Sequence, residues 1–446
     1  MTADALDLAG IGIGPFNLSL AAQLDSIPAV SARFFERRRE FAWHPGMMLP
    51  GVEMQTSILK DLVTATNPTS PWSFLAYLVA HRRFYQFLNA EYEAVPRTEF
   101  ADYLGWVARG LSSLSFGAAV EEVRAAVEEV RAADDGFALR VGAETVQARN
   151  LSIGVGKIPA LPAWAEALPK TMAFHNSEAA QRLPELKARR VAVIGGGQSG
   201  AEIVDALLDS HEAATIEWVS RRPNFEPLDA TPFTNELFTP TYVRDFHKLP
   251  EGLRLNHTHR QLLASDGISA ATLKKLYRRL YEEKLVAPGP KSREISLRPH
   301  RNVIAADRNG STIRLTVQNG FDNAVEQVVV DAVILATGYR FVLPAFMEQL
   351  KVRIAVNSLD EPVLAADFSL VWDGPADNRI FVLNAGRHSH GIAEPQLSLA
   401  AWRSAVIANA LLGREQFDLG QPLPIVRWAS EDSAIPQSSF FGEAAE

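Results

Sequence analysis

Two stretches of the chain show the same order of apolar run, glycine-rich turn and helical periodicity. The first reads LDLAGIGIG and continues as PFNLSLAAQLDS, in which Phe16, Leu20 and Leu24 share one helical face. SARFFER then predicts a second short strand. A strand, a helix and a strand in this order predict a parallel sheet with a right-handed crossover.

The second stretch begins at residue 189. RRVAVIGGGQSGAEIV predicts a strand, a glycine turn and the start of a helix, and IEWVSRR at 216–222 predicts the next strand. Between the two stretches, prolines interrupt residues 41–75 and predict loop, whereas residues 72–113 predict mostly helix. LSIGVGKIPALP at 151–162 predicts a strand with a proline-marked exit, which we interpret as a domain boundary.

The remaining segments predict smaller elements. Residues 118–131 repeat AAVEEVR, but two heptads are too few for a coiled coil, so we expect a duplication within a surface segment compatible with a strand. Residues 223–290 lose the strand–helix order and predict a helical insertion, after which short strands return at 293–330. VVVDAVILATGY at 328–339 predicts one buried strand running into a glycine turn, and 396–412 predicts an amphipathic helix. The last dozen residues predict a mobile polar tail.

The composition is that of a soluble globular protein. The 446 residues are 47% apolar and 22% charged, and at roughly 150 residues per domain they predict about three domains, or two with a large insertion. The net charge of −8 disfavours nucleic acid or anionic lipid as the main partner, because both require a basic surface. No apolar stretch of about 20 residues predicts a membrane span. Asp4 and Asp7 stand where a signal peptide carries basic residues, so we expect a cytoplasmic protein.

The sequence contains no cysteine, which excludes several chemistries. Disulfides, thiolate metal sites, a cysteine nucleophile and a redox-active dithiol all require this residue. The ten histidines allow a metal in principle, but neither HxxxH nor HExxH occurs, so we predict no metal site.

The first glycine turn has the features of a dinucleotide site. Gly10, Gly12 and Gly14 follow a strand and open a helix, where backbone N–H groups and the helix dipole favour a pyrophosphate. Pro15 replaces the third glycine of G-x-G-x-x-G, and proline is well tolerated at the first helical position. Glu36 ends the second strand and can accept ribose hydroxyls. The alternative is a tight turn that binds no ligand.

The second glycine turn matches G-x-G-x-x-G fully, again between a strand and a helix. The following strand ends in a hydroxyl and two guanidinium groups rather than an acid. These groups favour a 2′-phosphate, so we predict NADPH over NADH, unless the arginines only solvate the strand end. The predicted residues are Gly195, Gly197, Gln198, Ser199, Gly200, Ser220, Arg221 and Arg222, with Thr337 and Gly338 of the ATGY segment returning beside them.

Two nucleotide folds in one chain predict an α/β flavoprotein that uses NADPH. The fold class is two Rossmann-like dinucleotide-binding domains, for FAD and NADPH, with a small, mostly helical substrate-binding region. We predict that residues 1–168 form the first part of the FAD domain and 169–325 the NADPH domain, with the insertion at about 223–290. Residues 326–446 complete the FAD domain and the tail.

Six motifs resemble those of the microbial N-hydroxylating flavin monooxygenases, which make hydroxylamines for hydroxamate siderophores. They are GIGIGPFNLSLAA, FAWHPGM, MQTSILKDLV, VIGGGQSGAE, ILATGY and HGIAEPQLSLAAWRSA, in this order from about residue 7 to 412. The resemblance is greatest to the L-lysine N-hydroxylase branch and its diamine relatives. The FxGxxxHxxxWP signature of Baeyer–Villiger enzymes is absent.

The resemblance implies a reaction cycle in which no side chain is assigned as catalytic. NADPH passes hydride to FAD, reduced flavin binds oxygen as a hydroperoxide, and the substrate amine attacks the distal oxygen to give a hydroxylamine and water. An alkylamine with a pKa near 10.4 is neutral in only about 1 molecule in 10³ at neutral pH, so the site must favour the neutral amine. It must also exclude water.

The resemblance also implies site residues. Lys60 matches a lysine that holds the substrate carboxylate in ornithine-specific relatives; here it either does the same, keeps the amine neutral as a nearby cation, or is a solvated loop residue. The other matches are Met54 and Gln55 near flavin and substrate, Trp43 and His44 around the flavin, and Ser398 near both. The alternative for Trp43 and His44 is ordinary packing within the loop.

One stretch departs from the ornithine-specific members, whose Asn-rich NTNYS-like segment is replaced by ASDGIS at 264–269. Lysine enzymes show a similar SDGI stretch, and diamine enzymes need no carboxylate clamp. Asp266 is therefore predicted to attract the distal ammonium of a diamine or the α-amino group of lysine. His388 and His390 are interpreted as structural, and Asn384, Gln396 and Leu397 as near nucleotide or flavin edges.

The sequence therefore predicts an FAD- and NADPH-dependent monooxygenase that acts on the terminal amine of L-lysine, cadaverine or putrescine with O2. The resemblance implies a homo-oligomer, commonly a tetramer. Two alternatives stay open: another flavin monooxygenase or oxidase, and a non-catalytic nucleotide-binding protein.

Overall fold

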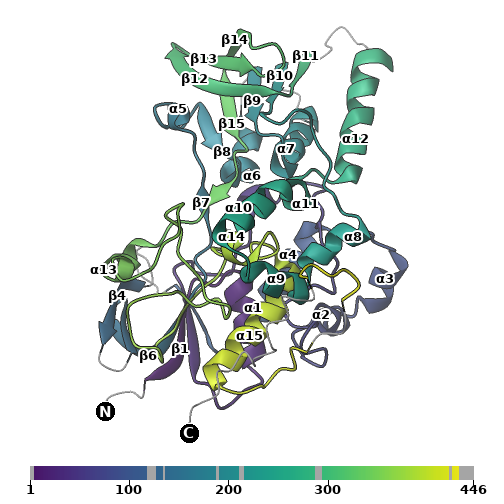
Figure 1. Ribbon diagram of the computed structural model, residues 1–446. Helices are drawn as coiled ribbons and strands as arrows, with labels where there is room; N and C mark the ends of the chain where they lie inside the picture. Colours follow the sequence, from purple (N-terminus) through teal and green to yellow (C-terminus); the bar gives the residue numbers. More distant parts are fainter. Residues whose placement is uncertain are drawn as a thin grey trace.

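The computed structural model describes residues 5–117, 127–133, 136–186, 190–209, 215–286, 294–420 and 424–430 (Figure 1). The predicted polar tail and the first part of the AAVEEVR repeat lie outside these residues. The end of the repeat forms strand β4 (Val127–Ala133), which agrees with a strand rather than a coiled coil.

The first sheet has seven strands and carries the N-terminal glycine loop. Its order is β3-β2-β1-β6-β5-β4, and β17 also pairs with β6. Strands β1, β2, β3 and β17 run parallel to their neighbours, whereas β4, β5 and β6 form an antiparallel ribbon. The bounds are β1 Leu6–Ile11, β2 Ala32–Glu36, β3 Leu114–Phe116, β5 Gly136–Val141, β6 Glu144–Ile153 and β17 Ile380–Val382.

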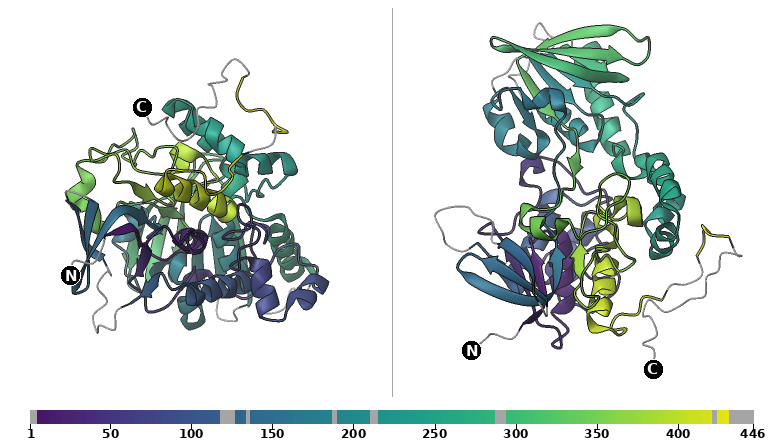
Figure 2. Two further views of the ribbon diagram at one scale, coloured as in Figure 1. Left: turned by 90° about the horizontal axis from the view of Figure 1, so that it is seen from below. Right: turned by 60° about the vertical axis from the view of Figure 1, so that its left-hand side comes forward.

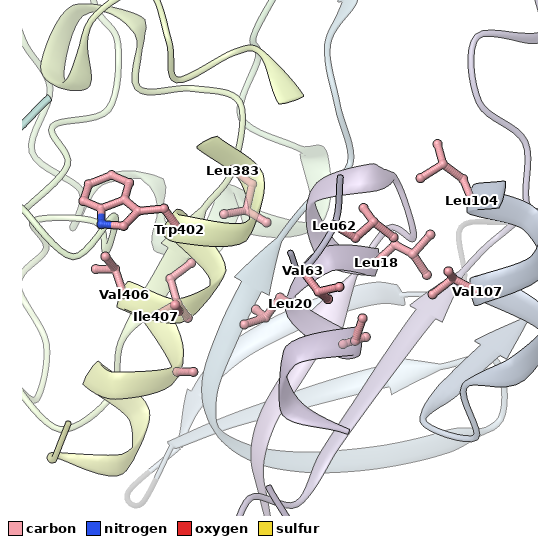
Figure 3. Close-up of a cluster of buried hydrophobic side chains, with 14 of the residues drawn as sticks. Leu18, Leu20, Leu62, Val63, Leu104, Val107, Leu383, Trp402, Val406 and Ile407 are labelled. Atoms are coloured by element: carbon pink, nitrogen blue, oxygen red, sulfur yellow. The ribbon is translucent and has the colours of Figure 1, made fainter. Parts of the chain in front are cut away.

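Helix α1 (Pro15–Leu24) packs beside helix α15 (Ala400–Leu412) on this sheet, although almost the whole chain separates them (Figures 1 and 3). Trp402, Val406 and Ile407 of α15 belong to the same buried cluster as Leu18 and Leu20. The prediction of an amphipathic helix here is wrong, because α15 is buried on every side from Ala400 to Asn409. The neighbouring helices are α2 Phe74–Ala80, α3 Phe84–Asn89 and α4 Arg97–Gly110.

The second sheet is five-stranded and entirely parallel, with order β11-β10-β9-β15-β8. A three-stranded antiparallel sheet packs against it through a shared apolar cluster. The bounds are β8 Ala173–His175, β9 Arg190–Ile194, β10 Thr215–Val219, β11 Glu294–Arg298, β12 Arg301–Asn309, β13 Thr312–Asn319, β14 Val325–Val330 and β15 Ala332–Leu335; helix α7 (Gln198–Asp209) follows β9.

The predicted single strand at 328–339 is wrong, because it is two strands in two different sheets. The chain changes sheet at Asp331, whose carboxylate accepts hydrogen bonds from the backbone N–H and the guanidinium of Arg190, at 2.9 and 2.6 Å. Strand β15 therefore lies in the second sheet, beyond the boundary predicted at residue 325.

The predicted helical insertion is helical. The side chains of Thr231, Thr239 and Ser269 accept N–H bonds at three helix starts, which fixes where these helices begin. The elements are α8 Pro232–Asn235, η4 Glu236–Phe238, α9 Pro240–His247, α10 Glu251–Arg260, α11 Leu262–Asp266, α12 Ala270–Tyr281 and the π-helical turn η5 Glu282–Val286.

The two sheets lie toward opposite ends of an elongated molecule (Figure 2). The chain crosses between them twice, and the crossings pair where β7 (Ile158–Pro159) meets β16 (Tyr339–Arg340). The short elements are η1 Pro45–Met47, α5 Ala163–Glu166, η2 Asn176–Glu178, α6 Ala179–Arg182, η3 Leu183–Glu185, η6 Ala345–Met347, α13 Glu348–Lys351, α14 Arg387–His390 and η7 Leu397–Leu399. Among the described residues, no helix has the length and apolar character to cross a membrane.

Candidate active site

The first glycine loop closes tightly at the carboxyl end of β1. Gly12 has φ +84°, and a Cβ there would lie 2.8 Å from the carbonyl oxygen of Gly154. A Cβ on Gly10 would lie 2.0 Å from the Phe34 ring. Glu36 accepts the N–H of Ile13 at 3.0 Å, so the acid at the end of β2 lies against the loop. Glycine is required at Gly10 and Gly12 by space, and at Gly12 also by backbone conformation.

Asn17 holds this loop in place, and the sequence reasoning missed it. Its side-chain amide donates to the carbonyl oxygen of Gly12 at 2.8 Å, and its oxygen accepts from the Ser152 hydroxyl of β6 at 2.6 Å. The signal was a polar residue on the buried face of a helix, since Asn17 is fully buried.

The first loop fits the pyrophosphate of FAD. Gly14 is the N-cap of α1, Pro15 is its first residue, and no described side chain caps the helix. A Cβ on Gly14 would meet only one atom within 4 Å, the Gly154 oxygen at 3.6 Å, so the start of the helix is open to a ligand. An uncapped N-terminus with approachable backbone is an anion site.

The second loop is equally tight. A Cβ on Gly195, whose φ is +137°, would lie 2.1 Å from the Ala336 oxygen, and one on Gly200 would lie 2.1 Å from the Gly195 oxygen. The indole N–H of Trp218, a second missed residue, donates to the Gly195 oxygen at 2.9 Å. There is space beside Gly197, because a Cβ there would have only the backbone carbonyl oxygen of Asp266 within 4 Å, at 3.6 Å. The second loop therefore fits the pyrophosphate of a nicotinamide dinucleotide.

The hydroxyl and guanidinium groups after β10 lie beside this second loop. The Ser220 hydroxyl is buried, accepts the Arg222 N–H at 3.1 Å and lies where a Cβ on Gly196 would be. The Arg222 guanidinium donates to the Gly196 oxygen at 3.4 Å, and Arg221 is exposed. The arginines, rather than Ser220, are thus available to a phosphate.

Thr337 and Gly338 connect the two crossings of the chain. The Thr337 hydroxyl donates to the Ala160 oxygen at 2.7 Å, and the Gly338 oxygen accepts the Ala160 N–H at 2.9 Å. Their predicted contact with NADPH remains a proposal, because these bonds explain both residues without a ligand.

The loop at 41–62 contacts both α1 and α7, the helices that follow the two glycine loops. Trp43 packs against His44 and Phe100, with ring centroids 5.2 and 5.8 Å apart, and Met54 is buried. The His44 side chain is exposed to solvent on one side. Desolvation by the surrounding protein atoms, and to a smaller extent the Arg97 guanidinium, lower its pKa to about 4. The His44 ring is therefore uncharged at neutral pH.

Lys60 is a half-buried cation, and burial lowers its pKa below the usual lysine value. Its Nζ lies 5.8 Å from the centroid of the Phe238 ring. Among the described residues, no carboxylate forms an ion pair with it. A partly desolvated cation of this kind can receive the carboxylate of a ligand.

Gln55 and Gln198 contact each other, although the sequence assigned them to different ligands. The Gln55 amide donates to Gln198 Oε1 at 3.4 Å, and the same oxygen accepts the Ser269 N–H at 2.8 Å. Ser199 follows at the start of α7. The loop at 41–62, the second glycine loop and the insertion meet at this point.

Asp266 already has a partner within the chain. Its Oδ2 accepts from the Arg387 guanidinium at 2.7 Å, and the neighbouring Ser265 oxygen accepts from the Gln396 amide at 3.4 Å. Leu397 packs on the core beside α1, and Ser398 is buried. The predicted contact of Asp266 with a substrate ammonium therefore has to compete with Arg387.

The two histidines of the C-terminal segment have separate structural partners. His388 Nδ1 lies 2.6 Å from Glu361 Oε2. The His390 ring is buried and stacks on Phe368, with centroids 4.2 Å apart. These contacts agree with their interpretation as structural residues.

A buried ion pair that the sequence reasoning missed supports Asn384. Arg403 donates to Glu394 at 2.8 Å, and Glu394 accepts the N–H of Asn384, whose φ is +71°. The Arg403 guanidinium also lies 4.0 Å from the centroid of Phe16, next to the first glycine loop. Arg403 and Glu394 are nine residues apart, which is not the i,i+3 or i,i+4 spacing of helical ion pairs, so the sequence pattern did not reveal the pair.

Residues 4–341 match the family described as L-lysine 6-monooxygenase/L-ornithine 5-monooxygenase. The chain belongs to this family. It is 42% identical over 428 residues to the L-lysine N6-monooxygenase of Escherichia coli, covering 96% of this chain and 99% of that one. It is 34% identical over 413 residues to a putrescine N-hydroxylase of Shewanella oneidensis, covering 91% and 81%.

Solved structures of the family share the fold. The FAD-bound cadaverine monooxygenase of the Erwinia amylovora desferrioxamine pathway has a TM-score of 0.88 at 28% identity, covering 96% of this chain and 99% of that one. The ornithine N-hydroxylase of Kutzneria sp. 744, with reduced FAD, NADP+ and L-ornithine, has 0.82 at 28%, covering 92% and 99%. The predicted family, fold class, enzyme class and pair of cofactors are confirmed.

Proposed function

We propose that this flavin-dependent monooxygenase hydroxylates the side-chain amine of L-lysine for hydroxamate siderophore biosynthesis, in the cytoplasm. The observation that carries the choice of substrate is Lys60, a half-buried cation without a carboxylate partner among the described residues. An amino acid offers a carboxylate for this cation, and a diamine does not. The 42% identity to the Escherichia coli L-lysine N6-monooxygenase supports the same choice.

In this proposal the first glycine loop and Glu36 hold FAD, and Trp43, His44, Met54, Gln396 and Leu397 line its site. The second loop holds NADPH, with Arg221 and Arg222 near its 2′-phosphate. When bound, the two cofactors supply the hydride and the activated oxygen. The chain's own contribution is to bind and orient them, to hold the amine and to exclude water.

In this proposal the substrate amine lies away from Lys60, at the other end of the L-lysine side chain. Burial lowers the pKa of Lys60, and a bound carboxylate would stabilise its charged form. The reaction requires a neutral amine, which desolvation at the amine end of the site would favour. Gln55, Ser398 and Asp266 are proposed to surround the substrate.

Cadaverine is the second candidate, favoured by the TM-score of 0.88 to a cadaverine monooxygenase. A diamine would leave Lys60 without a ligand contact. The predicted homo-oligomer, a tetramer in this proposal, is to be tested by sedimentation.

The deciding experiment supplies purified chain, FAD and oxygen with L-lysine, L-ornithine, cadaverine or putrescine, each with NADPH or NADH. Hydroxylamine, NAD(P)H consumed and peroxide are measured together. We expect hydroxylamine from L-lysine with NADPH preferred. Product from diamines alone would replace L-lysine with a diamine. NADPH consumed entirely into peroxide with every amine would leave only a flavin oxidase.

A further inference from the structure

One ion pair connects the first nucleotide unit to the helix of the second. Arg97, the first residue of α4, donates to both carboxylate oxygens of Glu202 in α7, at 2.7 and 3.1 Å. The two side chains are 14% and 5% exposed, so water screens the pair little. A two-point guanidinium–carboxylate contact fixes distance and orientation together.

Arg97 also forms hydrogen bonds to the loop at 41–62, which is proposed to contact the flavin. Its guanidinium donates to the Met47 oxygen at 3.0 Å and to the Glu53 oxygen at 3.4 Å, and its backbone N–H donates to the Val52 oxygen at 3.0 Å. The side chain and backbone of one residue, Arg97, therefore hold the segment that leads into Met54 and Gln55.

Glu202 lies one helical turn after Gln198, at the start of α7. The Gln198 amide donates to Glu202 Oε1 at 3.0 Å, while its oxygen accepts from Gln55. The first turns of α7 thus contact the first unit on one face. This is the helix whose N-terminus follows the second glycine loop.

Hydride transfer requires the donor and acceptor atoms to approach within about 3–3.5 Å, and an error of about 1 Å can cost roughly 100-fold in rate. The donor and the acceptor are held here by different units. An ion pair that fixes α7 against the loop at 41–62 therefore fixes the distance between the two cofactors.

We propose that Arg97 and Glu202 are positioning residues for hydride transfer from NADPH to FAD. The inference rests on the proposed function, because it assumes that the two loops hold these two cofactors. Neither residue touches a reacting atom; they act through the placement of α7.

The test compares Glu202→Gln and Arg97→Lys with a matched change on the same helix. Asp205 of α7 pairs with Arg279 and Lys275 of α12, at 2.6 and 2.7 Å, within the second unit. Asp205→Asn therefore removes two ion pairs of α7 without affecting its contact with the first unit. FAD content and dithionite reduction establish that each variant is folded and its flavin reducible.

In anaerobic stopped-flow, NADPH should reduce the flavin at least tenfold more slowly in Glu202→Gln, and by an intermediate factor in Arg97→Lys. In all three variants the affinity for NADP+ should stay within twofold of wild type. The rate of flavin reduction in Asp205→Asn should also stay within twofold of wild type. Amide exchange in the cofactor-free chain should rise at 46–55 and 198–204 in Glu202→Gln only.

If Asp205→Asn and Glu202→Gln slow flavin reduction equally, the Arg97–Glu202 pair contributes only to general stability and not to positioning. A wild-type rate in Glu202→Gln would remove the positioning role altogether. If NADPH fails to reduce even the wild-type flavin, the proposed function fails instead, and the exchange data still report whether the pair joins the two units.

Discussion

At the scale of single residues, this chain buries several charged or titratable groups, each with its own partner. Burial lowers the pKa of His390 well below the usual value, and the neighbouring His247 ring, 4.7 Å away, lowers it further. Burial also lowers the pKa of His247. Both rings are therefore neutral in the folded protein at pH values where an unfolded histidine is protonated.

We predict that the free energy of unfolding falls as the pH drops below about 6.5, by up to about 1.4 kcal/mol per pH unit for each such ring. Below this pH each of these histidines is protonated in the unfolded state but not in the folded state. Above this pH both states are unprotonated, so stability no longer depends on pH through these rings. His390→Phe keeps the stacking on Phe368 and should flatten the slope, as urea unfolding at pH 5 to 8 would measure. The exposed His259→Gln serves as control, and an unchanged slope in His390→Phe would contradict the assignment.

Lys60→Met should raise the KM for L-lysine by roughly 10- to 100-fold, the range expected for one lost hydrogen bond between charged groups. The KM for cadaverine should hardly change, since a diamine has no carboxylate. Steady-state hydroxylamine formation measures both. An equal rise for the two amines would show that Lys60 shapes the site without binding a carboxylate.

At the scale of elements, local sequence was sufficient to predict a turn or a helix where residues within that element determine its structure. Both glycine loops, α1 and α7 follow from apolar periodicity and from glycines that must avoid nearby atoms. The break at Asp331 and the burial of α15 depend on Arg190 and α1, which lie far away in the chain. Local pattern carries no information about such partners.

Gly12→Ala should abolish stable FAD binding. A methyl group would meet the Gly154 oxygen, and φ +84° is unfavourable for alanine, so the loop must move from α1. Gly142→Ala is the control, because Gly142 has φ +58° with open space around it; there we expect about 1–2 kcal/mol lost and FAD retained. Flavin absorbance after gel filtration measures occupancy, and full occupancy in Gly12→Ala would exclude this loop as the FAD site.

At the scale of the whole molecule, side chains from three parts of the chain meet between the two sheets. Lys157, which the sequence reasoning also missed, lies in the first crossing. Its pKa is lowered, chiefly by burial and also by Arg387, and the nearby acids Glu394, Asp266 and Glu361 offset this only in part. We propose that residues 5–153 and 380–412 form the FAD unit and 173–335 the NADPH unit. The sequence identified the two units but not the contacts between them, since Arg97 and Glu202 are 105 residues apart.

Asp266 and Arg387 give the last prediction. If their pair only joins the insertion to the C-terminal segment, Asp266→Asn and Arg387→Gln should lower the melting temperature equally, and the double variant should be no worse than either. If Asp266 also attracts the substrate, Asp266→Asn alone should raise the KM for L-lysine. A double-mutant cycle on stability and KM separates the two roles.

The pairing of α1 with α15 has a consequence during synthesis. The Ser19 and Ser404 hydroxyls lie 2.9 Å apart but 385 positions apart in the chain. At about 5–20 residues per second, a ribosome completes α1 roughly 20–80 seconds before α15 emerges. For that time the apolar surface of α1 is not covered by α15, so the nascent chain presents a hydrophobic surface to which a chaperone can bind until α15 has been synthesised.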